Sequence, residues 1–218
     1  MNKIIAIDGP AGSGKGTLAK ALAEKHNLVN IDTGATYRCV ALKVLKNNID
    51  LIETEKIIEI SKQINIELLQ NGKVLMDNQD VTQEIRSPEV TDIVPKISRI
   101  PEVRTNMVHI QRKIAEGKDV VMEGRDITTV VFPDAKYKFY LDASIESRAK
   151  RRYEENQTKG INTTYEEVYE SIQKRDYSDM NKPVGALKRT TEQIYIDTTN
   201  LSLDEEIEII TKIIEGDK

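Results

Sequence analysis

Short apolar runs recur along the chain, separated by longer segments in which apolar residues fall three and four positions apart. The runs predict five buried strands, at residues 3–7, 28–31, 120–122, 138–141 and 194–196. The helical spacing and the cap residues predict helices at 15–26, 35–46, 54–62, 102–116 and 144–160, and two more after the capping boxes that begin at Thr164 and Ser202. Strands that alternate with helices in this way favour a parallel sheet with helices on both faces.

One segment interrupts this alternation. The stretch INIELLQNGKVLMDNQDV, residues 64–81, consists of two β-rich runs joined by Asn71-Gly72, a pair typical of tight hairpin turns. The two strands of such a hairpin are antiparallel by construction. The segment therefore predicts a small separate lobe, inserted after the helices at 35–46 and 54–62.

The stretch between the first strand and the first helix is rich in glycine. Its sequence, GPAGSGKGT, comprises Gly9, Pro10, Ala11, Gly12, Ser13, Gly14, Lys15, Gly16 and Thr17. Glycines allow the backbone to curl so that several N–H groups point at one centre, and the helix dipole and Lys15 add positive potential there. A strand before and a helix after are the context that a phosphate-binding loop requires. The stretch predicts a nucleotide phosphate site rather than a turn that merely connects two elements.

The hydroxyl group of this loop comes one position later than the general pattern places it. In many phosphate loops the residue after the lysine is Ser or Thr and binds Mg²⁺ directly, but Gly16 occupies that position here. Thr17 would have to reach the metal or act through water.

Arginines follow the predicted strands at several points. Arg38 lies one helical turn into the segment after the second strand, where Thr33 and Gly34 are expected in the turn, and Arg125 follows the third strand. Arg175 and Asp179 are four residues apart, which places them on one face of a helix. Ligands bind at the carboxyl ends of the strands in open α/β sheets, and the planar guanidinium holds two phosphate oxygens at once. The arginines therefore predict a second phosphate group, on the acceptor.

Five motifs occur in the order GPAGSGKGT, DTGATYR, EGRDITTVVFPDA, YLDAS and RDYSD, and together they resemble the bacterial cytidylate kinases, nucleoside-monophosphate kinases of the P-loop class. The resemblance spans nearly the whole chain, the hairpin lobe included. It implies a P-loop NTPase fold with a five-stranded parallel sheet flanked by helices, a β-rich insert and a short lid. The implied division is a core of 1–36, 85–146 and 166–218, a monophosphate-binding insert of 37–84 and a lid of 147–165.

The resemblance also implies an activity, partners and a role for each matching residue. The chain would transfer a phosphoryl group from ATP, with Mg²⁺, to CMP or dCMP, and would act as a monomer. The implied catalytic residues are Lys15, Arg125 and Arg152, and ATP would be bound by residues 9–17 with Arg151 and Arg152. Thr17 and Glu123 would serve the metal through water. The implied CMP site consists of Thr33, Gly34, Arg38, Arg104, Gly124, Arg125, Asp126, Arg175, Asp179 and Lys182.

Within that CMP site the resemblance divides the work. Arg38 and Arg125 would hold the acceptor phosphate, and Thr33 and Arg104 would face the base. Arg175 and Asp179 would hold the ribose, with Asp126 ordering the cluster. In the lid helix, Arg148 lies one turn before Arg152, on the same face.

The chain departs from the family pattern at two positions. The pattern R-D-x-x-D-x-x-R ends in Lys182 here, which keeps the positive charge but loses the planar fork. The acid before G-R-D is usually Asp, and here it is Glu123, whose longer side chain could still order water around Mg²⁺.

The reaction itself needs no strong base, because the second pKa of a phosphate monoester is about 6 and the attacking oxygen is already an anion. Two alternatives remain on the residues alone. One is a kinase on the same fold for UMP, AMP or a non-nucleotide acceptor. The other is a nucleotide-dependent switch, although no N-K-x-D guanine motif occurs and MNKP at 180–183 lacks its Asp.

Composition limits the setting further. The chain of 218 residues has a net charge of −4, which argues against broad nucleic-acid binding. No apolar run approaches the roughly 18 residues of a membrane span, and the N-terminus leads directly into a strand without a signal peptide. A single cysteine, Cys39, forbids an intrachain disulfide. These features predict a cytoplasmic protein without nucleic-acid or membrane partners.

Overall fold

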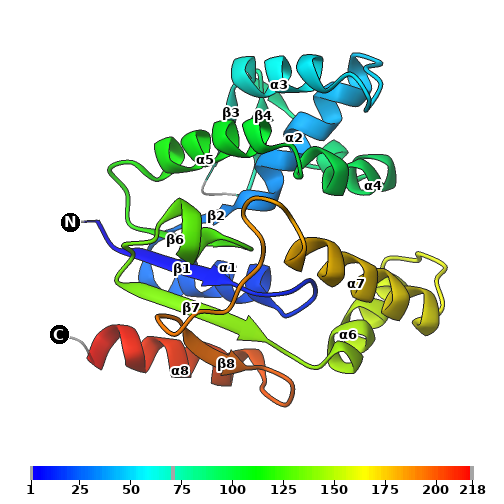
Figure 1. Ribbon diagram of the computed structural model, residues 1–218. Coiled ribbons are helices and arrows are strands. Elements are labelled where there is room, and N and C mark those ends of the chain that lie inside the picture. Colours follow the sequence, from blue (N-terminus) through cyan, green and yellow to red (C-terminus); the bar gives the residue numbers. More distant parts are fainter. Residues whose placement is uncertain (1, 70–71, 217–218) are drawn as a thin grey trace.

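The computed structural model describes residues 2–69 and 72–216. Figure 1 shows a parallel sheet in the lower half of the molecule and a helical lobe above it. The strands of the sheet are β1 (Ile4–Asp8), β2 (Val29–Asp32), β6 (Val120–Gly124), β7 (Tyr137–Asp142) and β8 (Ile194–Asp197). The helices that connect and cover them are α1 (Lys15–His26), α5 (Pro101–Ala115), α6 (Ile145–Thr158), α7 (Tyr165–Met180) and α8 (Leu203–Gly216).

The sheet has the strand order β2-β6-β1-β7-β8, and all its pairings are parallel. Strand β1 is central: Ile5 is paired with Val121 on one side and with Tyr137 on the other. The five-stranded parallel sheet that the sequence predicts is therefore confirmed. Because all strands run the same way, the segments that follow β1, β2 and β6 emerge at one edge.

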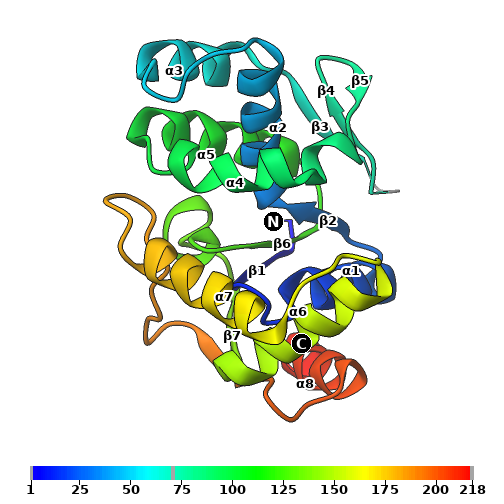
Figure 2. The same ribbon diagram turned by 90° about the vertical axis from the view of Figure 1, so that its right-hand side faces the viewer.

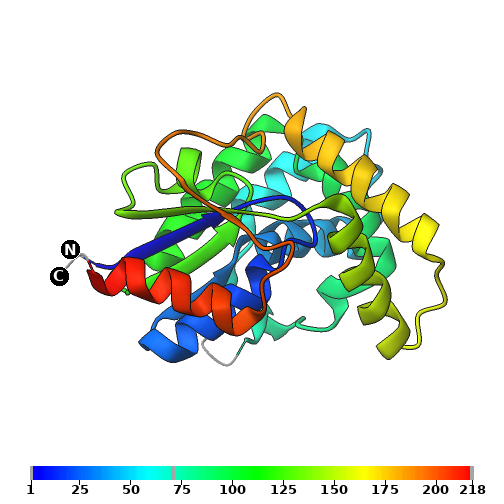
Figure 3. The same cartoon turned by 90° about the horizontal axis from the view of Figure 1, so that it is seen from below.

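Helices cover both faces of this sheet. Leu18 and Leu22 of α1 pack with Ile210 of α8 against Ile5 and Ile7 on one face, and Figure 3 shows these two helices side by side beneath the strands. On the other face, Ala115 at the end of α5 and the short turn η2 (Ile127–Val131) cover Ile31, Val120 and Met122. Burying apolar surface on both faces is what continuous apolar strands require.

A separate lobe contains α2 (Thr33–Lys46), α3 (Thr54–Gln63), β3 (Ile66–Leu68), β4 (Val74–Met76), β5 (Gln79–Asp80), η1 (Glu84–Arg86) and α4 (Pro88–Ile97). We call these elements the insert lobe. Its core includes Val40 and Val44 of α2 with Ile57 of α3, and Val103 and Met107 of α5 pack against the same core. The lobe is thus held to the sheet by α2 and α5, which follow β2 and precede β6.

The antiparallel hairpin predicted in this lobe is confirmed, since Ile66 of β3 pairs with Met76 of β4. Asn71 of its predicted turn lies outside the described residues, and Gly72 has a φ of +80°. A third strand, β5, was not predicted from the sequence. It follows a turn in which Asp77 and Asn78 both have positive φ, a conformation that these residue types tolerate better than most.

Helix α4 was also not predicted, and helix α2 begins earlier than expected. Helix α4 forms although Pro95 lies inside it. Ser87 caps its N-terminus by accepting a hydrogen bond from the Val90 N–H at 3.4 Å. Thr33 and Gly34 form the first turn of α2 rather than a preceding loop, because Asp32 caps it and accepts from the Ala35 N–H at 3.2 Å. This correction places Thr33 at a helix N-terminus.

Helices α6 and α7 form an antiparallel pair, which we call the lid hairpin; in Figure 2 it lies beside the sheet, below the insert lobe. Ala149 of α6 packs with Val168 and Ile172 of α7. The capping box at Thr164 and Glu167 is confirmed by reciprocal hydrogen bonds of 2.8 and 3.2 Å. No helix in the described part of the chain has the length and apolar character to cross a membrane.

Candidate active site

The glycine-rich loop connects β1 to α1, as the sequence predicts. A Cβ atom at Gly9 would overlap the carbonyl oxygen of Leu141, so the close approach of the two strands requires glycine there. Gly14 adopts the left-handed conformation (φ +90°) at the N-cap of α1. The ammonium group of Lys15 folds back over the loop and donates to Pro10 O at 2.6 Å and to Ser13 Oγ at 3.2 Å. The loop is therefore formed around its own lysine.

The charge on Lys15 is costly in this position. Burial and the neighbouring guanidinium of Arg125 lower the pKa of Lys15 to about 7, against the opposing influence of Glu123. Burial, together with the nearby carboxylate of Asp32, raises the pKa of Glu123. A cation whose pKa is lowered this far has a strong electrostatic demand for an anion, which the phosphates of a nucleotide supply.

A buried ion pair anchors the loop to the lid hairpin. Arg148 of α6 contacts Asp176 of α7 at 2.6 Å and donates to the carbonyl oxygens of Ala11 at 3.0 Å and Ala143 at 2.9 Å. Asp176 also accepts from the Ala11 N–H at 3.3 Å. Arg148 and Arg152 lie one turn apart on α6, as the sequence predicts, but Arg148 is buried and hydrogen-bonded to the loop whereas Arg152 is exposed. Asp176, the partner of Arg148, is the first aspartate of the RDYSD motif, but nothing in the sequence indicates that the two side chains meet.

A carboxylate clamp holds the end of β6 to the end of α7. Asp179 contacts Arg125 Nε through one oxygen and Lys182 Nζ through the other, both at 2.7 Å. Burial would raise the pKa of Asp179, but Arg125 and Lys182 outweigh it and hold that pKa well below its usual range. Lys182 stands where the pattern R-D-x-x-D-x-x-R ends in arginine, and its ammonium group contacts Asp179 through a single nitrogen.

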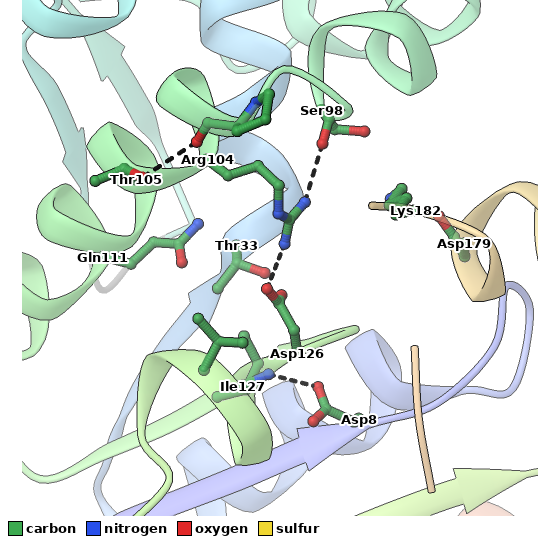
Figure 4. Close-up of polar contacts among 12 residues, drawn as sticks. Asp8, Thr33, Ser98, Arg104, Thr105, Gln111, Asp126, Ile127, Asp179 and Lys182 are labelled. Atoms are coloured by element: carbon green, nitrogen blue, oxygen red, sulfur yellow. Dashed lines mark hydrogen bonds and ion pairs between the residues drawn. The ribbon is translucent and has the colours of Figure 1, made fainter. Parts of the chain in front are cut away.

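Arg104 and Asp126 form another buried ion pair (Figure 4). Arg104 also donates to Ser98 O at 3.1 Å, and its guanidinium lies over the ring of Tyr37, 5.5 Å from the centroid. These contacts fix the plane of the guanidinium. An arginine held in one orientation can read the edge of a flat ligand.

Asp8, which the sequence analysis did not single out, positions the segment after β6. It is fully buried and accepts hydrogen bonds from the N–H groups of Ile127 and Thr128, each at 2.8 Å, and from the Thr128 hydroxyl at 2.6 Å. Burial raises its pKa to about 6 although these hydrogen bonds oppose the shift. The signal that could have found it is a charged residue at the end of an otherwise apolar strand.

Arg38 points into the same cleft from α2. It contacts Asp32 at 2.5 Å, and Asp32 lies 3.7 Å from Arg86 as well. The buried Nε of Arg38 has no hydrogen-bond partner among the described residues. Thr33 donates its hydroxyl to Glu123 O at 2.8 Å, and a Cβ at Gly124 would collide with that hydroxyl. Gly124 thus allows β2 and β6 to approach each other.

Most of the predicted site residues line one cavity of ≈ 1250 Å³ between the sheet edge, the insert lobe and the lid hairpin, whereas Asp8, Arg148 and Asp176 do not. The predicted residues that line it are Ala11, Gly12, Gly14, Lys15, Gly16, Thr17, Thr33, Gly34, Arg38, Arg104, Glu123, Gly124, Arg125, Asp126, Arg151, Arg152, Arg175, Asp179 and Lys182. Gly9, Pro10 and Ser13, also in the loop, do not line the cavity. Arg151 is engaged at the rim, where it donates to the carbonyl oxygen of Thr198. Loss of solvent, together with the charges of Arg125, Arg38 and Arg152, lowers the pKa of Arg175 to about 10.

The donor set at the front of the loop fits a hard divalent cation. Glu123 points toward Gly16: its Oε1 lies 3.6 Å from the position that a Cβ of Gly16 would take. The hydroxyl of Thr17 is exposed in the first turn of α1. Within residues 2–69 and 72–216, no group of three or more His, Cys, Asp or Glu side chains is arranged to hold a metal ion. The two oxygen donors, on Glu123 and Thr17, suit Mg²⁺, which keeps several waters and takes its other ligands from substrate phosphates.

Fold and cleft together define a phosphate-loop kinase. Comparison with known proteins is consistent with this class. The protein-family model for cytidylate kinase matches residues 5–216, and the chain belongs to that family. It is 50% identical over 210 residues to the cytidylate kinase of Caldanaerobacter subterraneus subsp. tengcongensis, covering 96% of this chain and 93% of that protein.

One further relative and one solved structure are also similar to the chain. The cytidylate kinase of Fusobacterium nucleatum is 46% identical over 214 residues, with 98% of each chain covered. Among solved structures, shikimate kinase from Acinetobacter baumannii superposes with a TM-score of 0.50 at 15% identity, covering 100% of this chain and 96% of that chain. A similarity at that level of identity concerns the fold alone.

Proposed function

We infer that the protein transfers the γ-phosphoryl group of ATP to CMP or dCMP, giving ADP and CDP or dCDP. The observation that carries this inference is that Lys15 of the phosphate loop lines the same cavity as Arg38, Arg125 and Arg175. A loop for one phosphorylated ligand and a cluster of arginines for another, opening into one space, suit a transfer between two polyanions. The family membership supports cytidine as the base of the acceptor.

The electrostatic environment of the cleft accounts for the chemistry. The attacking oxygen of a monophosphate is already anionic at neutral pH, so no general base is needed. The barrier comes from bringing like charges together and from the charge that spreads over the transferred group. Lys15 would neutralise the donor phosphates, and Arg38 and Arg125 the acceptor phosphate, with Arg125 also placed to stabilise the transferred group. Arg152, half exposed on α6, would complete the set from the lid hairpin.

Recognition of the acceptor would fall to the residues of two ion pairs, Arg104–Asp126 and Arg125–Asp179. Arg104, fixed by Asp126 and Ser98, is suited to hydrogen-bond the edge of the base, with Thr33 beside it. Asp179 would accept from a ribose hydroxyl and Arg175 would donate to the sugar. Lys182 holds Asp179 in place from the opposite side at 2.7 Å. A Cβ at Gly34 would crowd the side chains of Asp32 and Arg38, so glycine leaves room for their ion pair.

Mg²⁺ would arrive with ATP and be held through water by Thr17 and Glu123. When bound, it neutralises charge on the donor phosphates and draws electron density from the transferring group. The hydroxyl placed one residue late fits an outer-shell contact rather than direct ligation.

Several finer properties belong to the same proposal. We propose a monomeric, cytoplasmic enzyme of pyrimidine nucleotide metabolism, without nucleic-acid or membrane partners. We also propose that the predicted insert, 37–84, binds the acceptor and moves together with the rest of the insert lobe through Ile97, and that the predicted lid, 147–165, moves as well; the remainder of 1–36, 85–146 and 166–218 is the core. Closure of both would exclude the water that could otherwise accept the phosphoryl group.

An acceptor panel tests the function. ADP release from ATP–Mg²⁺ is measured with CMP, dCMP, UMP, AMP, shikimate and no acceptor. We expect strong turnover only with CMP and dCMP. Turnover only with UMP or AMP would show that the enzyme uses a different acceptor from the one inferred here. ATP hydrolysis without any acceptor would favour a nucleotide switch.

A further inference from the structure

Glu155 is a carboxylate of the lid hairpin for which the reaction described above has no role. It lies on α6, one helical turn after Arg152, and its two oxygens contact two cations. Arg152 lies 3.0 Å from one oxygen, and Lys159 lies 2.5 Å from the other. Glu155 and Arg152 both line the cavity, whereas Lys159 does not. In this structure Glu155 therefore holds an arginine that the reaction needs at the transferred phosphate.

A third cation, on the insert lobe, lines the same cavity as Glu155. Arg86 belongs to η1 of the insert lobe and lines the same cavity. Its side chain is 56% exposed, and its ion pair with Asp32 is long, at 3.7 Å. Asp32 already has a closer partner in Arg38, at 2.5 Å. Arg86 is thus weakly held and can change partners at little cost.

Glu155 and Arg86 form no ion pair in this structure, but their charges already interact. Burial would raise the pKa of Glu155, yet that pKa is lowered, chiefly by Lys159 and Arg152 and also by Arg86 across the cavity. The interaction joins the two parts of the molecule that border the nucleotide sites. It has the sign that favours their approach.

We propose that Glu155 is a positioning residue that couples the two closing parts of the enzyme: it holds Arg152 while the cleft is open, and on closure it exchanges Arg152 for Arg86. The exchange would leave the guanidinium of Arg152 free to contact the transferred phosphate. It would also tie the lid hairpin to the insert lobe when both substrates are bound. The proposal rests on the phosphoryl-transfer function inferred above.

Two effects follow for a Glu155→Gln variant. Closure loses one opposite-charge contact, so kcat with ATP and CMP should fall by about fivefold, the upper end for a solvent-accessible ion pair. Incomplete closure admits water, so the ratio of inorganic phosphate to CDP formed should rise. KM for each nucleotide should change by less than twofold, because Glu155 contacts neither substrate.

Matched controls separate this role from a general loss of charge or of stability. Glu154→Gln removes the neighbouring carboxylate, which is exposed and does not line the cavity. Lys159→Gln removes the other ion-pair partner of Glu155 on the side away from the cleft. Both should keep the kcat and the phosphate-to-CDP ratio of the wild type. Glu155→Asp should recover part of the activity, and all four variants should unfold within about 2 °C of the wild type.

The decisive experiment is a double-mutant cycle of Arg86→Gln and Glu155→Gln, read by kcat with CMP. If the pair forms during turnover, the double variant should be no slower than the slower single variant, and the coupling should weaken in 0.5 M KCl. If the two single variants lose kcat by factors that multiply in the double variant, the proposal is overturned. It is also overturned if Glu155→Gln has the same kcat as Glu154→Gln. Failure of the inferred function is distinguishable, because the wild-type enzyme itself would then not phosphorylate CMP.

Discussion

Binding of ATP–Mg²⁺ should draw a proton onto Lys15. In the structure, burial and Arg125 lower the pKa of this lysine to about 7. Nucleotide phosphates beside the ammonium group raise its pKa back toward its ordinary value, as opposite charges at contact distance do. The proton taken up equals the neutral fraction of the empty site, which is about 0.1 at pH 6, about 0.5 at pH 7 and about 0.9 at pH 8. The affinity for ATP should therefore fall as the pH rises above 7, approaching tenfold per pH unit.

Titration calorimetry measures this uptake directly. The binding enthalpy at pH 8 is determined in two buffers that differ in ionisation enthalpy, and the slope gives the number of protons exchanged. At pH 8 the terminal phosphate, with a pKa of about 6, contributes no proton of its own. Lys15→Arg is the matched control, since a guanidinium stays protonated and should show no uptake. A wild-type slope of zero at pH 8, or the same slope in Lys15→Arg, would refute the reasoning.

The remaining predictions concern single residues. Lys15→Met should abolish turnover and leave the circular dichroism spectrum unchanged; near-normal activity would remove the phosphate-loop assignment. Asp179→Ala should slow both substrates, because Arg125 loses its partner at 2.7 Å, but CMP more than dCMP if the carboxylate reads the 2′-hydroxyl; equal losses in kcat/KM would contradict that role. Arg148→Ala leaves Asp176 buried and without its partner at 2.6 Å, so it should cost about 3–5 kcal/mol in the free energy of unfolding. Denaturation in urea measures that cost, and a loss below about 1 kcal/mol would mean that the pair does not anchor the loop.

The inner strands of the sheet could be predicted because burial on both faces leaves a continuous apolar run; the expectation that 194–196 is also buried is wrong, since only Ile196 of β8 is buried. The predicted 3–7 corresponds to Ile4–Asp8, and 194–196 to Ile194–Asp197. The elements that were missed carry no such pattern. Strand β5 is only Gln79 and Asp80, both exposed, and α4 contains Pro95, which argues against a helix in any local interpretation.

The site was predictable to the extent that its chemistry lies in local motifs. The phosphate loop and the arginines after β2 and β6 stand out by residue type and by their place after a strand. The side chains that position them do not. Asp8 meets Thr128 at a separation of 120 residues, and Arg148 meets Ala11 at a separation of 137. Helical periodicity places Arg148 and Arg152 on one face, but only the packing of α6 against the loop distinguishes the buried arginine from the exposed one.

The most direct test of the central claim follows the transferred group itself. ATP labelled in its γ-phosphate is mixed with Mg²⁺, CMP and the enzyme, and the products are separated after a few turnovers. The label should appear in the β-phosphate of CDP, with little in inorganic phosphate. Label found only in inorganic phosphate, or retained in ATP while Lys15→Met behaves like the wild type, would contradict transfer between two nucleotides in this cleft.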